Sequence, residues 1–276
     1  MLKLIAFDLD GTILRDNKEL SRRSLEALEL AAGKGIRIVP ATGRLYSGIP
    51  EEIRTLPFVR YVIAANGAEV YDAAEGKVLR RAELTLAEAG RILAYIKGEP
   101  AILGCYRDGK GWMDREELSR MEEYAQTPKL AEIMKRVYTP VDGMENFLKS
   151  SDHTVQKLML FYSDLEARKR TLERMGAELA DLAVSTSVPN NIEINAREAT
   201  KGGALKFLCE YLHLNRRESA AFGDGTNDIT MIRQAGTGIA MGNACPEVLK
   251  AADQVTKSND QDGVAVWIEE YLTGGH

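Results

Sequence analysis

Cysteine is scarce in this sequence. The chain has three cysteines, Cys105, Cys209 and Cys245, and no two of them form a CxxC pair. An odd, scattered set argues against a disulfide framework and predicts reduced thiols in a reducing compartment. No stretch approaches the ~20 apolar residues that span a bilayer, and the apolar run at the N-terminus is too short for a signal peptide. We therefore expect a cytoplasmic protein with no membrane partner.

Basic residues are too few to form a nucleic-acid surface. The formal net charge is −5 at pH 7 and the pI is about 5.5, whereas a nucleic-acid footprint needs a basic patch or stripe. The longest basic cluster, Arg168-Lys169-Arg170, falls within a helical pattern and is typical of a solvated helix face. We therefore expect no nucleic-acid partner.

Apolar residues, in contrast, are plentiful enough for a sizeable core. They make up 45% of the 276 residues, which argues against general disorder. The length is comfortable for two domains.

Strand and helix signals alternate at both ends of the chain. Short apolar runs bounded by turn residues predict strands, and apolar residues at helical spacing predict helices. Strands that alternate with helices across short loops favour a parallel sheet with both faces covered. The fold class expected from this pattern is α/β, with a doubly wound parallel, Rossmann-like sheet as the core. The predicted strands are 2–7, 36–41, 61–65, 219–222 and 238–241, and the predicted helices of the last third are 201–212, 227–234 and 264–272.

The middle of the chain has a different pattern. Thr85 and Glu88 form a capping box that opens a helix. Further strands are predicted at 102–106, 155–162, 182–186 and 192–194, and helices at 116–126 and 164–175, whereas 129–151 has no clear assignment. We interpret residues 83–189 as an inserted α+β domain. The core domain then comprises residues 1–82 and 190–276, so both chain ends belong to it.

Polar side chains follow several of the predicted core strands. In an open parallel sheet, ligands bind outside the carboxyl ends of the strands. The side chains that this rule brings to one edge come from four distant segments; they are Asp8, Asp10, Thr42, Lys201, Asp224 and Asp228.

This set of side chains predicts a phosphoryl-transfer site. Several carboxylates at one place repel one another and need a cation. Oxygen ligands without histidine or cysteine favour Mg²⁺ over Zn²⁺. Thr42, Lys201 and glycine-rich turns offer a hydroxyl, a positive charge and backbone N–H groups to a phosphate. Metal, phosphate ligands and a spare carboxylate together make such a site.

Four ordered motifs in the sequence resemble those of the haloacid dehalogenase superfamily. They are Asp8-Leu9-Asp10-Gly11-Thr12, Ala41-Thr42-Gly43-Arg44, Lys201-Gly202 and Gly223-Asp224-Gly225-Thr226-Asn227-Asp228. By position and length, the central insertion resembles the C2B cap of the Cof-type phosphatases. Three further segments match that subfamily; they are Asn66-Gly67-Ala68, Ala240-Met241-Gly242-Asn243-Ala244 and Asp262-Gly263-Val264-Ala265.

The resemblance implies roles for the first three motifs. Asp8 would be the nucleophile and a ligand of Mg²⁺. Asp10 would be the general acid and then the general base, and its backbone carbonyl would bind Mg²⁺. Thr42 and Lys201 would bind the phosphoryl oxygens, and Gly43 would offer its N–H.

The resemblance also implies roles for the fourth motif and for Arg44. Asp224 would bind Mg²⁺ directly, and Asp228 would support the metal through water. Asn227 would orient Asp8 or the phosphate, and Arg44 would touch the substrate. One departure from the family pattern is the polar stretch 195–200 before Lys201, which puts local substrate contacts in question.

These roles require two different protonation states. With an ordinary pKa of ~3.9, Asp8 would be ionised at neutral pH and could attack phosphorus without a base. Asp10 must hold a proton for the leaving alkoxide, so we expect neighbouring acids and partial burial to raise its pKa.

The expected function is a Mg²⁺-dependent phosphatase that hydrolyses a small phosphorylated metabolite, such as a sugar phosphate or phosphorylated cofactor, through an aspartyl-phosphate intermediate. One alternative is a phosphomutase or phosphotransferase of the same superfamily. Another is a non-catalytic sensor of a phosphorylated metabolite. The sequence leaves the physiological substrate and the oligomeric state open.

Overall fold

The chain folds into two compact units. The computed structural model describes residues 1–125, 127–150 and 152–274. The first unit comprises Met1–Arg44, Ile49–Arg81 and the chain from Thr200 onward, and the second comprises Leu45–Gly48 and Ala82–Ala199.

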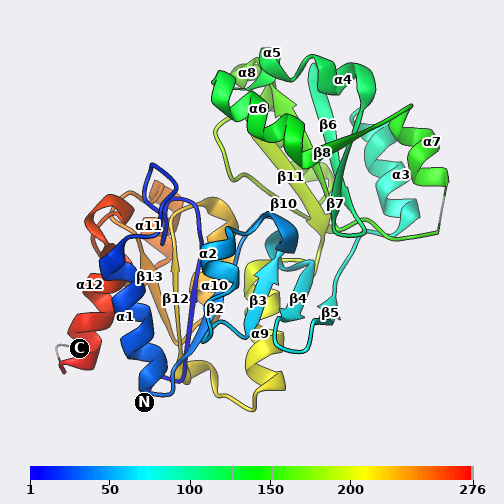
Figure 1. Cartoon of the computed structure of the whole chain (residues 1–276). Helices are drawn as coiled ribbons and strands as arrows, with labels where there is room; N and C mark the ends of the chain where they lie inside the picture. The colour runs from blue at the N-terminus through cyan, green and yellow to red at the C-terminus, as the bar shows by residue number, and fades with distance from the viewer. Residues whose placement is uncertain (126, 151, 275–276) are drawn as a thin grey trace. The chain divides into compact units, whose positions relative to one another are not determined.

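A parallel sheet forms the centre of the first unit, as the sequence predicts. Its strand order is β14-β13-β12-β1-β2, and every neighbouring pair is parallel (Figure 1). The buried strand β1 is therefore flanked by β12 from the last third of the chain and β2 from the first third. The strands are β1 (Leu4–Phe7), β2 (Arg37–Pro40), β12 (Ser219–Gly223), β13 (Thr237–Ala240) and β14 (Gln254–Val255).

Helices cover both faces of this sheet, which confirms the doubly wound class. On one face, Leu4 of β1 joins a core cluster with Leu205 and Leu208 of α9 (Lys201–Tyr211). On the other face, Phe222 packs edge-on against Trp267 of α12 (Gly263–Leu272), with ring centroids 5.2 Å apart.

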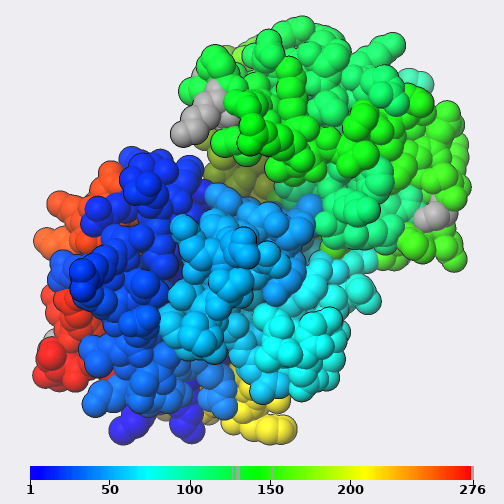
Figure 2. Space-filling model, in the orientation of Figure 1, coloured from blue at the N-terminus to red at the C-terminus, as the bar shows by residue number. Residues whose placement is uncertain are grey.

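The helices on the two faces are paired. On the face of α9, α10 (Ile229–Gln234) packs against it. On the face of α12, α1 (Arg22–Gly33) packs beside it, so the N-terminal and C-terminal segments are adjacent on the surface (Figure 2). Shorter helices are α2 (Glu51–Arg54) and α11 (Pro246–Ala251).

A small antiparallel sheet continues the first unit. It is formed by β3 (Tyr61–Ala64), β4 (Glu69–Asp72) and β5 (Lys77–Arg81). A parallel bridge between Ala41 and Ile63 places β3 beside the segment that follows β2. The sequence predicts β3 but not β4 or β5.

The second unit is built on one six-stranded sheet with helices, as expected for an α+β insertion. Its strand order is β10-β11-β9-β6-β7-β8, antiparallel except for the parallel pair β7 and β8. The strands are β6 (Ala101–Arg107), β7 (Lys110–Asp114), β8 (Tyr138–Val141), β9 (Lys157–Tyr162), β10 (Leu182–Ser185) and β11 (Asn191–Ala196).

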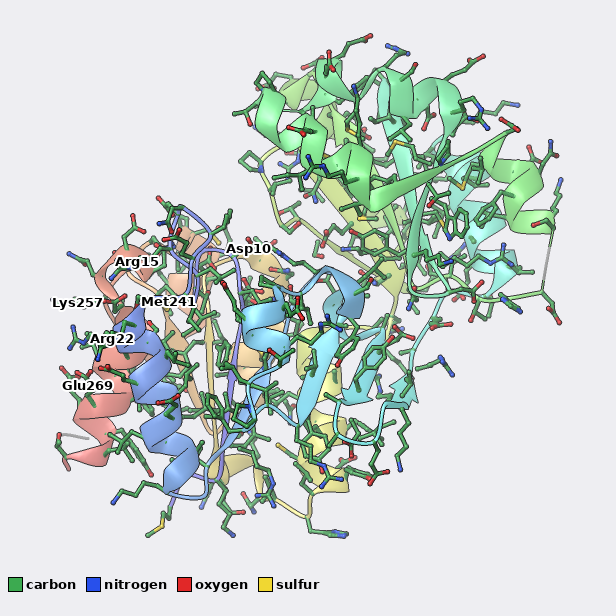
Figure 3. The ribbon with its side chains drawn as sticks, in the orientation of Figure 1. Asp10, Arg15, Arg22, Met241, Lys257 and Glu269 are labelled. Atoms are coloured by element: carbon green, nitrogen blue, oxygen red, sulfur yellow. The ribbon has the colours of Figure 1, made fainter. Side chains whose placement is uncertain are left out.

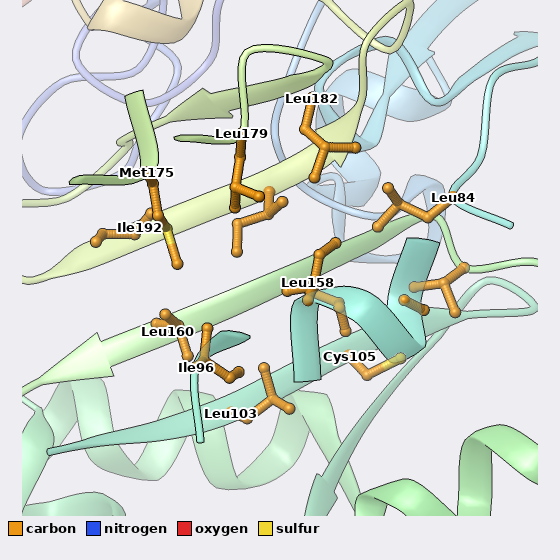
Figure 4. Packing of buried hydrophobic residues seen from close by; sticks show 14 of the residues in the cluster. Leu84, Ile96, Leu103, Cys105, Leu158, Leu160, Met175, Leu179, Leu182 and Ile192 are labelled. Atoms are coloured by element: carbon orange, nitrogen blue, oxygen red, sulfur yellow. The ribbon is translucent and has the colours of Figure 1, made fainter. Parts of the chain in front are cut away.

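Helices of the second unit pack on its sheet. The main helices are α3 (Leu86–Tyr95) and α8 (Leu165–Glu178), and the Thr85–Glu88 capping box that opens α3 is present. Leu158 and Ile192 of the sheet share a buried cluster with Met175 of α8 (Figure 4). The shorter helices are α4 (Arg115–Ser119), α5 (Met121–Tyr124), α6 (Pro128–Val137) and α7 (Met144–Lys149).

Two details of the central region differ from expectation. The helix predicted over 116–126 is divided into α4 and α5 at Arg120, and residue 126 lies outside the described residues. The stretch 129–151, left unassigned from the sequence, contains all of α6 after Pro128, then β8 and α7, while residue 151 lies outside the described residues.

The change between units also lies later in the chain than the expected domain boundary at residue 190. Strand β11 pairs with β9 and β10, so it belongs to the second unit, and the first unit resumes at Thr200. The division into a catalytic core and a cap stays a prediction.

In the described part of the chain, no helix combines the length and the apolar character needed to cross a bilayer.

Candidate active site

The loop after β1 carries the two acids of the first motif. Asp8 follows the last residue of β1 and is buried, and its N–H donates to the carbonyl of Phe222 on β12 at 3.1 Å. Gly11 lies close to Asp224: a Cβ at Gly11 would be 2.4 Å from Asp224 Oδ2. Its positive φ of 80° also suits glycine. This glycine therefore lets the first and fourth motifs approach each other. Asp10 and Arg15, labelled in Figure 3, lie on the same loop.

Lys201 joins two of these motifs through a fully buried ammonium group. It is the first residue of α9, whose N-cap Thr200 accepts a hydrogen bond from the N–H of Gly203 at 3.0 Å. Lys201 Nζ donates to Asp8 Oδ1 at 2.5 Å and to Asp228 Oδ1 at 2.6 Å. The start of the helix thus places one positive charge between two buried carboxylates.

The loop after β12 holds the other two acids. Asp228 is fully buried, and its Oδ2 accepts the N–H groups of Asp224 and Gly225, both at 3.0 Å. Thr12 Oγ1 donates to Asp224 Oδ1 at 2.7 Å. These contacts fix both carboxylates, and Thr12 is a site contact to which the sequence analysis assigns no role.

Asp8, Asp224 and Asp228 form a group that could hold a metal ion. One carboxylate oxygen from each lies within 4.8 Å of the other two. The group consists of carboxylates alone, and hard cations such as Mg²⁺ prefer oxygen ligands. Lys201 balances only part of the negative charge. The donor set therefore fits a divalent cation, in agreement with the metal site of the proteins that the motifs resemble.

The pKa of Asp8 lies well above the ordinary range, contrary to expectation. Burial is the largest cause and raises the pKa; Lys201 lowers it, and the carboxylates of Asp228, Asp224 and Asp10 raise it further. Burial by itself would lower the pKa of Lys201, but the carboxylates of Asp228 and Asp8 outweigh burial and raise this pKa. The protein alone therefore does not give Asp8 the ordinary carboxylate pKa that the sequence suggests.

The pKa of Asp10 shifts in the opposite direction. Burial would raise it, but Arg44 and Lys18 together lower it. Arg44 donates to both carboxylate oxygens of Asp10, through Nε and Nη2, at 2.8 Å each. Lys18 Nζ lies 3.0 Å from Asp10 Oδ1. The expectation of a raised pKa for Asp10 is wrong because the sequence does not show these two cations facing it.

The remaining predicted phosphate ligands lie near the carboxyl edge but contact other groups. Thr42 follows β2 and is buried, and its Oγ1 accepts the backbone N–H of Arg44 at 3.1 Å. Gly43, between them, is half-buried. The side-chain amide of Asn227 donates to Asn66 Oδ1 at 3.1 Å. The phosphate-binding roles of these residues stay predictions.

Comparison with known proteins decides the family. A family profile described as haloacid dehalogenase-like hydrolase matches residues 5–268, almost the whole chain. The chain belongs to the haloacid dehalogenase-like hydrolases.

Relatives from Bacillus subtilis support this membership along the full length. Phosphatase YwpJ is 30% identical over 294 residues, covering 98% of this chain and 100% of that protein. The 5-amino-6-(5-phospho-D-ribitylamino)uracil phosphatase YcsE is 31% identical, covering 98% of this chain and 96% of that protein. The structure of a haloacid dehalogenase-like hydrolase from the same organism has a TM-score of 0.85 at 29% identity, covering 97% of this chain and 99% of that one. The expected Cof-type membership and the enzyme class, a phosphoric monoester phosphatase, are confirmed.

Three contacts of this hydrolase site were not predicted. Thr12 is the last residue of the first motif, and this position in the motif could have indicated that it contacts the site. The turn dipeptide Asn66-Gly67 predicts a turn at Asn66, but it does not predict the contact with Asn227. Lys18 has a positive φ of 71° in the loop after β1, and nothing in its sequence neighbourhood indicates that it faces Asp10.

Asp224 gives the first testable prediction, a pH dependence of stability. Burial, and then Asp228, raises the pKa of Asp224 from 3.8 to about 6. A carboxyl that binds its proton more tightly when folded stabilises the fold below pH about 4, and this contribution is lost as the pH rises through about 6. Without metal, we therefore expect Asp224→Asn to be more stable than the wild type at pH 7, by on the order of 1–3 kcal/mol.

Denaturant unfolding at pH 4 and pH 7, in the presence of a chelator, measures this difference. Asparagine keeps an acceptor for Thr12, so the comparison isolates the charge. Added Mg²⁺ should stabilise the wild type more than Asp224→Asn. A stability difference that is the same at both pH values would contradict the assigned shift.

Proposed function

We propose that this hydrolase removes the phosphoryl group from a small phosphorylated metabolite, with Asp8 as nucleophile and Mg²⁺ as cofactor. The observation that carries the proposal is the cluster of Asp8, Asp224, Asp228 and Lys201 at the carboxyl edge of the sheet. The carboxylate of Asp8 lies beside the buried ammonium group of Lys201. Together with Asp224 and Asp228, it also forms a group of three carboxylates that fits a hard cation.

The first step is the transfer of the phosphoryl group to Asp8. A carboxylate oxygen of Asp8 forms a bond to phosphorus, while the bond between phosphorus and the ester oxygen breaks. The leaving oxygen takes a proton from Asp10. Bound Mg²⁺, held by Asp8, Asp224 and the backbone carbonyl of Asp10 and supported by Asp228, would supply positive charge that offsets the repulsion between phosphate and carboxylates.

The second step is hydrolysis of the aspartyl-phosphate. Water forms the new bond to phosphorus, its proton goes to Asp10, and Asp8 leaves as a carboxylate. The contacts of Asp10 with Arg44 and Lys18 favour the ionised form, which is the form that this step needs. The first step needs the acid form instead. A substrate phosphate competes for the guanidinium of Arg44, and this would loosen the pair and raise the pKa of Asp10.

The phosphate side of the site would be formed by Thr42, Gly43, Lys201 and Asn227. Thr42 and Lys201 offer side-chain donors, and Gly43 a backbone N–H. Arg44 would contact the substrate when it leaves Asp10.

The substrate class proposed is a sugar phosphate or a phosphorylated cofactor precursor. YcsE, whose name gives a phosphorylated ribitylaminouracil as its substrate, supports this range. We propose that the second unit acts as the cap domain and selects the organic part of the substrate. Relatives named as phosphatases favour hydrolysis over transfer to a second sugar.

Phosphate release from a panel of phosphorylated metabolites tests the proposal. We expect release with Mg²⁺, its loss on addition of a chelator, and its return when Mg²⁺ is restored in excess. Transfer to an added sugar with little free phosphate would favour the phosphotransferase. Hydrolysis that continues unchanged in excess chelator would contradict the role of the metal.

A further inference from the structure

The turn after β3 has an unusual backbone. Ala65 and Asn66 of the helical turn η2 (Ala65–Gly67) both have positive φ values, of 48° and 61°. Left-handed residues other than glycine are uncommon, and consecutive ones indicate a conformation that the surroundings must stabilise. Asparagine tolerates this region better than most residues. Only 3% of Asn66 is exposed, so its polar side chain is buried as well.

This turn contacts the loop of the second motif through its backbone. The N–H of Ala65 donates to the carbonyl of Arg44 at 2.8 Å, and the N–H of Asn66 donates to the carbonyl of Thr42 at 2.9 Å. The strained conformation thus directs two successive N–H groups at the proposed phosphate loop.

The same turn also meets the third and fourth motifs. Asn66 Oδ1 accepts the side-chain amide of Asn227 at 3.1 Å. At Gly67, a Cβ atom would lie 2.3 Å from the carbonyl oxygen of Thr200, the residue that caps the helix of Lys201. The turn therefore touches each of the three segments that we assign to the phosphate.

We propose that Asn66 is a positioning residue for phosphate binding, acting through Asn227. Its side-chain oxygen holds the Asn227 amide group in one orientation, and its left-handed backbone joins the Thr42 loop to the Asn227 loop. A purely conformational requirement would be met by glycine, which adopts positive φ without strain. The buried amide of asparagine has the additional effect of orienting Asn227. This inference rests on the proposed phosphatase function.

The first test replaces Asn66 with glycine. Asn66→Gly keeps the left-handed backbone accessible and removes the acceptor for Asn227. We expect kcat/KM for p-nitrophenyl phosphate with Mg²⁺ to fall about 10–100-fold, the size of effect known for groups that orient metal-binding side chains. Calorimetry with inorganic phosphate should show weaker binding.

His213→Gly is the matched control. His213 also has a positive φ, of 54°, but it is exposed at the end of α9 and has no contact with the proposed site. Both variants make the unfolded chain more flexible by replacing a residue with glycine. We expect His213→Gly to keep wild-type kcat/KM and phosphate binding, with only a small change in stability, because the exposed His213 loses no buried hydrogen bond.

A double-mutant cycle separates positioning from general structural damage. If Asn66 acts through Asn227, the double variant Asn66→Gly/Asn227→Ala should match Asn227→Ala alone within about twofold. Additive losses, or phosphate binding and kcat/KM in Asn66→Gly that equal the wild type, would overturn the inference.

The outcomes also distinguish this inference from the proposed function. If the wild type binds inorganic phosphate but shows no hydrolysis, the catalytic proposal fails, and the calorimetric cycle still decides whether Asn66 acts through Asn227. A wild type that neither hydrolyses the ester nor binds phosphate would overturn both.

Discussion

Asp8→Asn should lower phosphatase turnover by roughly 10⁴-fold or more, because it removes the atom that attacks phosphorus. The fold should survive the change. The asparagine oxygen can still accept from Lys201, whose ammonium also keeps Asp228 as a partner. Steady-state kinetics with p-nitrophenyl phosphate and a thermal unfolding scan of the same preparation measure the two effects.

Asp16→Asn provides the control for this substitution. Asp16 is exposed in the same loop and accepts a hydrogen bond from Asn259 at 3.0 Å, so the chemical change is identical but lies outside the proposed site. We expect its turnover to equal that of the wild type. Wild-type turnover in a folded Asp8→Asn protein would exclude the nucleophilic role of Asp8.

Asp10→Asn should lower turnover by about 10²–10⁴-fold, the usual contribution of a general acid and base. The backbone carbonyl is unchanged, so the Mg²⁺ requirement should change little. p-Nitrophenolate can leave as the anion without taking a proton, so formation of the aspartyl-phosphate should be less impaired than its hydrolysis. The intermediate should therefore accumulate with this substrate.

Asp224→Asn should behave differently, because its carboxylate is proposed as a direct metal ligand. We expect it to raise the Mg²⁺ concentration needed for activity and to slow both steps. Rapid-quench kinetics at several Mg²⁺ concentrations compare the two variants. If Asp10→Asn mainly raised the Mg²⁺ requirement and no phosphoenzyme appeared, the separate roles of its backbone and side chain would be wrong.

The fold was predictable where local patterns agree with tertiary structure. The apolar runs of β1, β2 and β12 are buried on both faces, so each stands out from the polar turns around it. Strand β5 (Lys77–Arg81) was missed because it is polar and has no buried residue. Strand β14 (Gln254–Val255) has only two residues and no pattern of its own.

The boundary of the insertion was harder to predict for a related reason. Polar residues Asn191, Glu193 and Asn195 alternate with apolar ones along β11, yet all three are buried. Glu193 pairs with the buried Lys157 at 2.8 Å, and Asn195 donates to the carbonyl of Gln156 at 2.9 Å. These partners lie far away in the sequence, so the pattern predicts a strand at 192–194 but does not show which of the two units contains it.

In the candidate active site, too, contacts between residues that are far apart in the sequence could be predicted only in part. The convergence of Asp8, Asp224 and Lys201 follows from their positions after strands and at a helix start, which sequence reasoning can recognise. The pairing of Asp10 with Arg44 depends on where the side chains of two loops point, and the sequence pattern does not predict these directions. The pKa directions of Asp8 and Asp10 follow from such pairings and from burial, so both expectations were wrong.

The most direct test of the covalent mechanism is to identify the phosphorylated residue. Asp10→Asn, mixed with p-nitrophenyl phosphate and Mg²⁺ and quenched in acid, should yield a peptide that carries one phosphoryl group on Asp8, as seen by mass spectrometry. The group should be absent without Mg²⁺ and in the double variant Asp8→Asn/Asp10→Asn. A phosphoryl group on another residue, or its absence from Asp8 while the ester is still cleaved, would contradict an aspartyl-phosphate at Asp8.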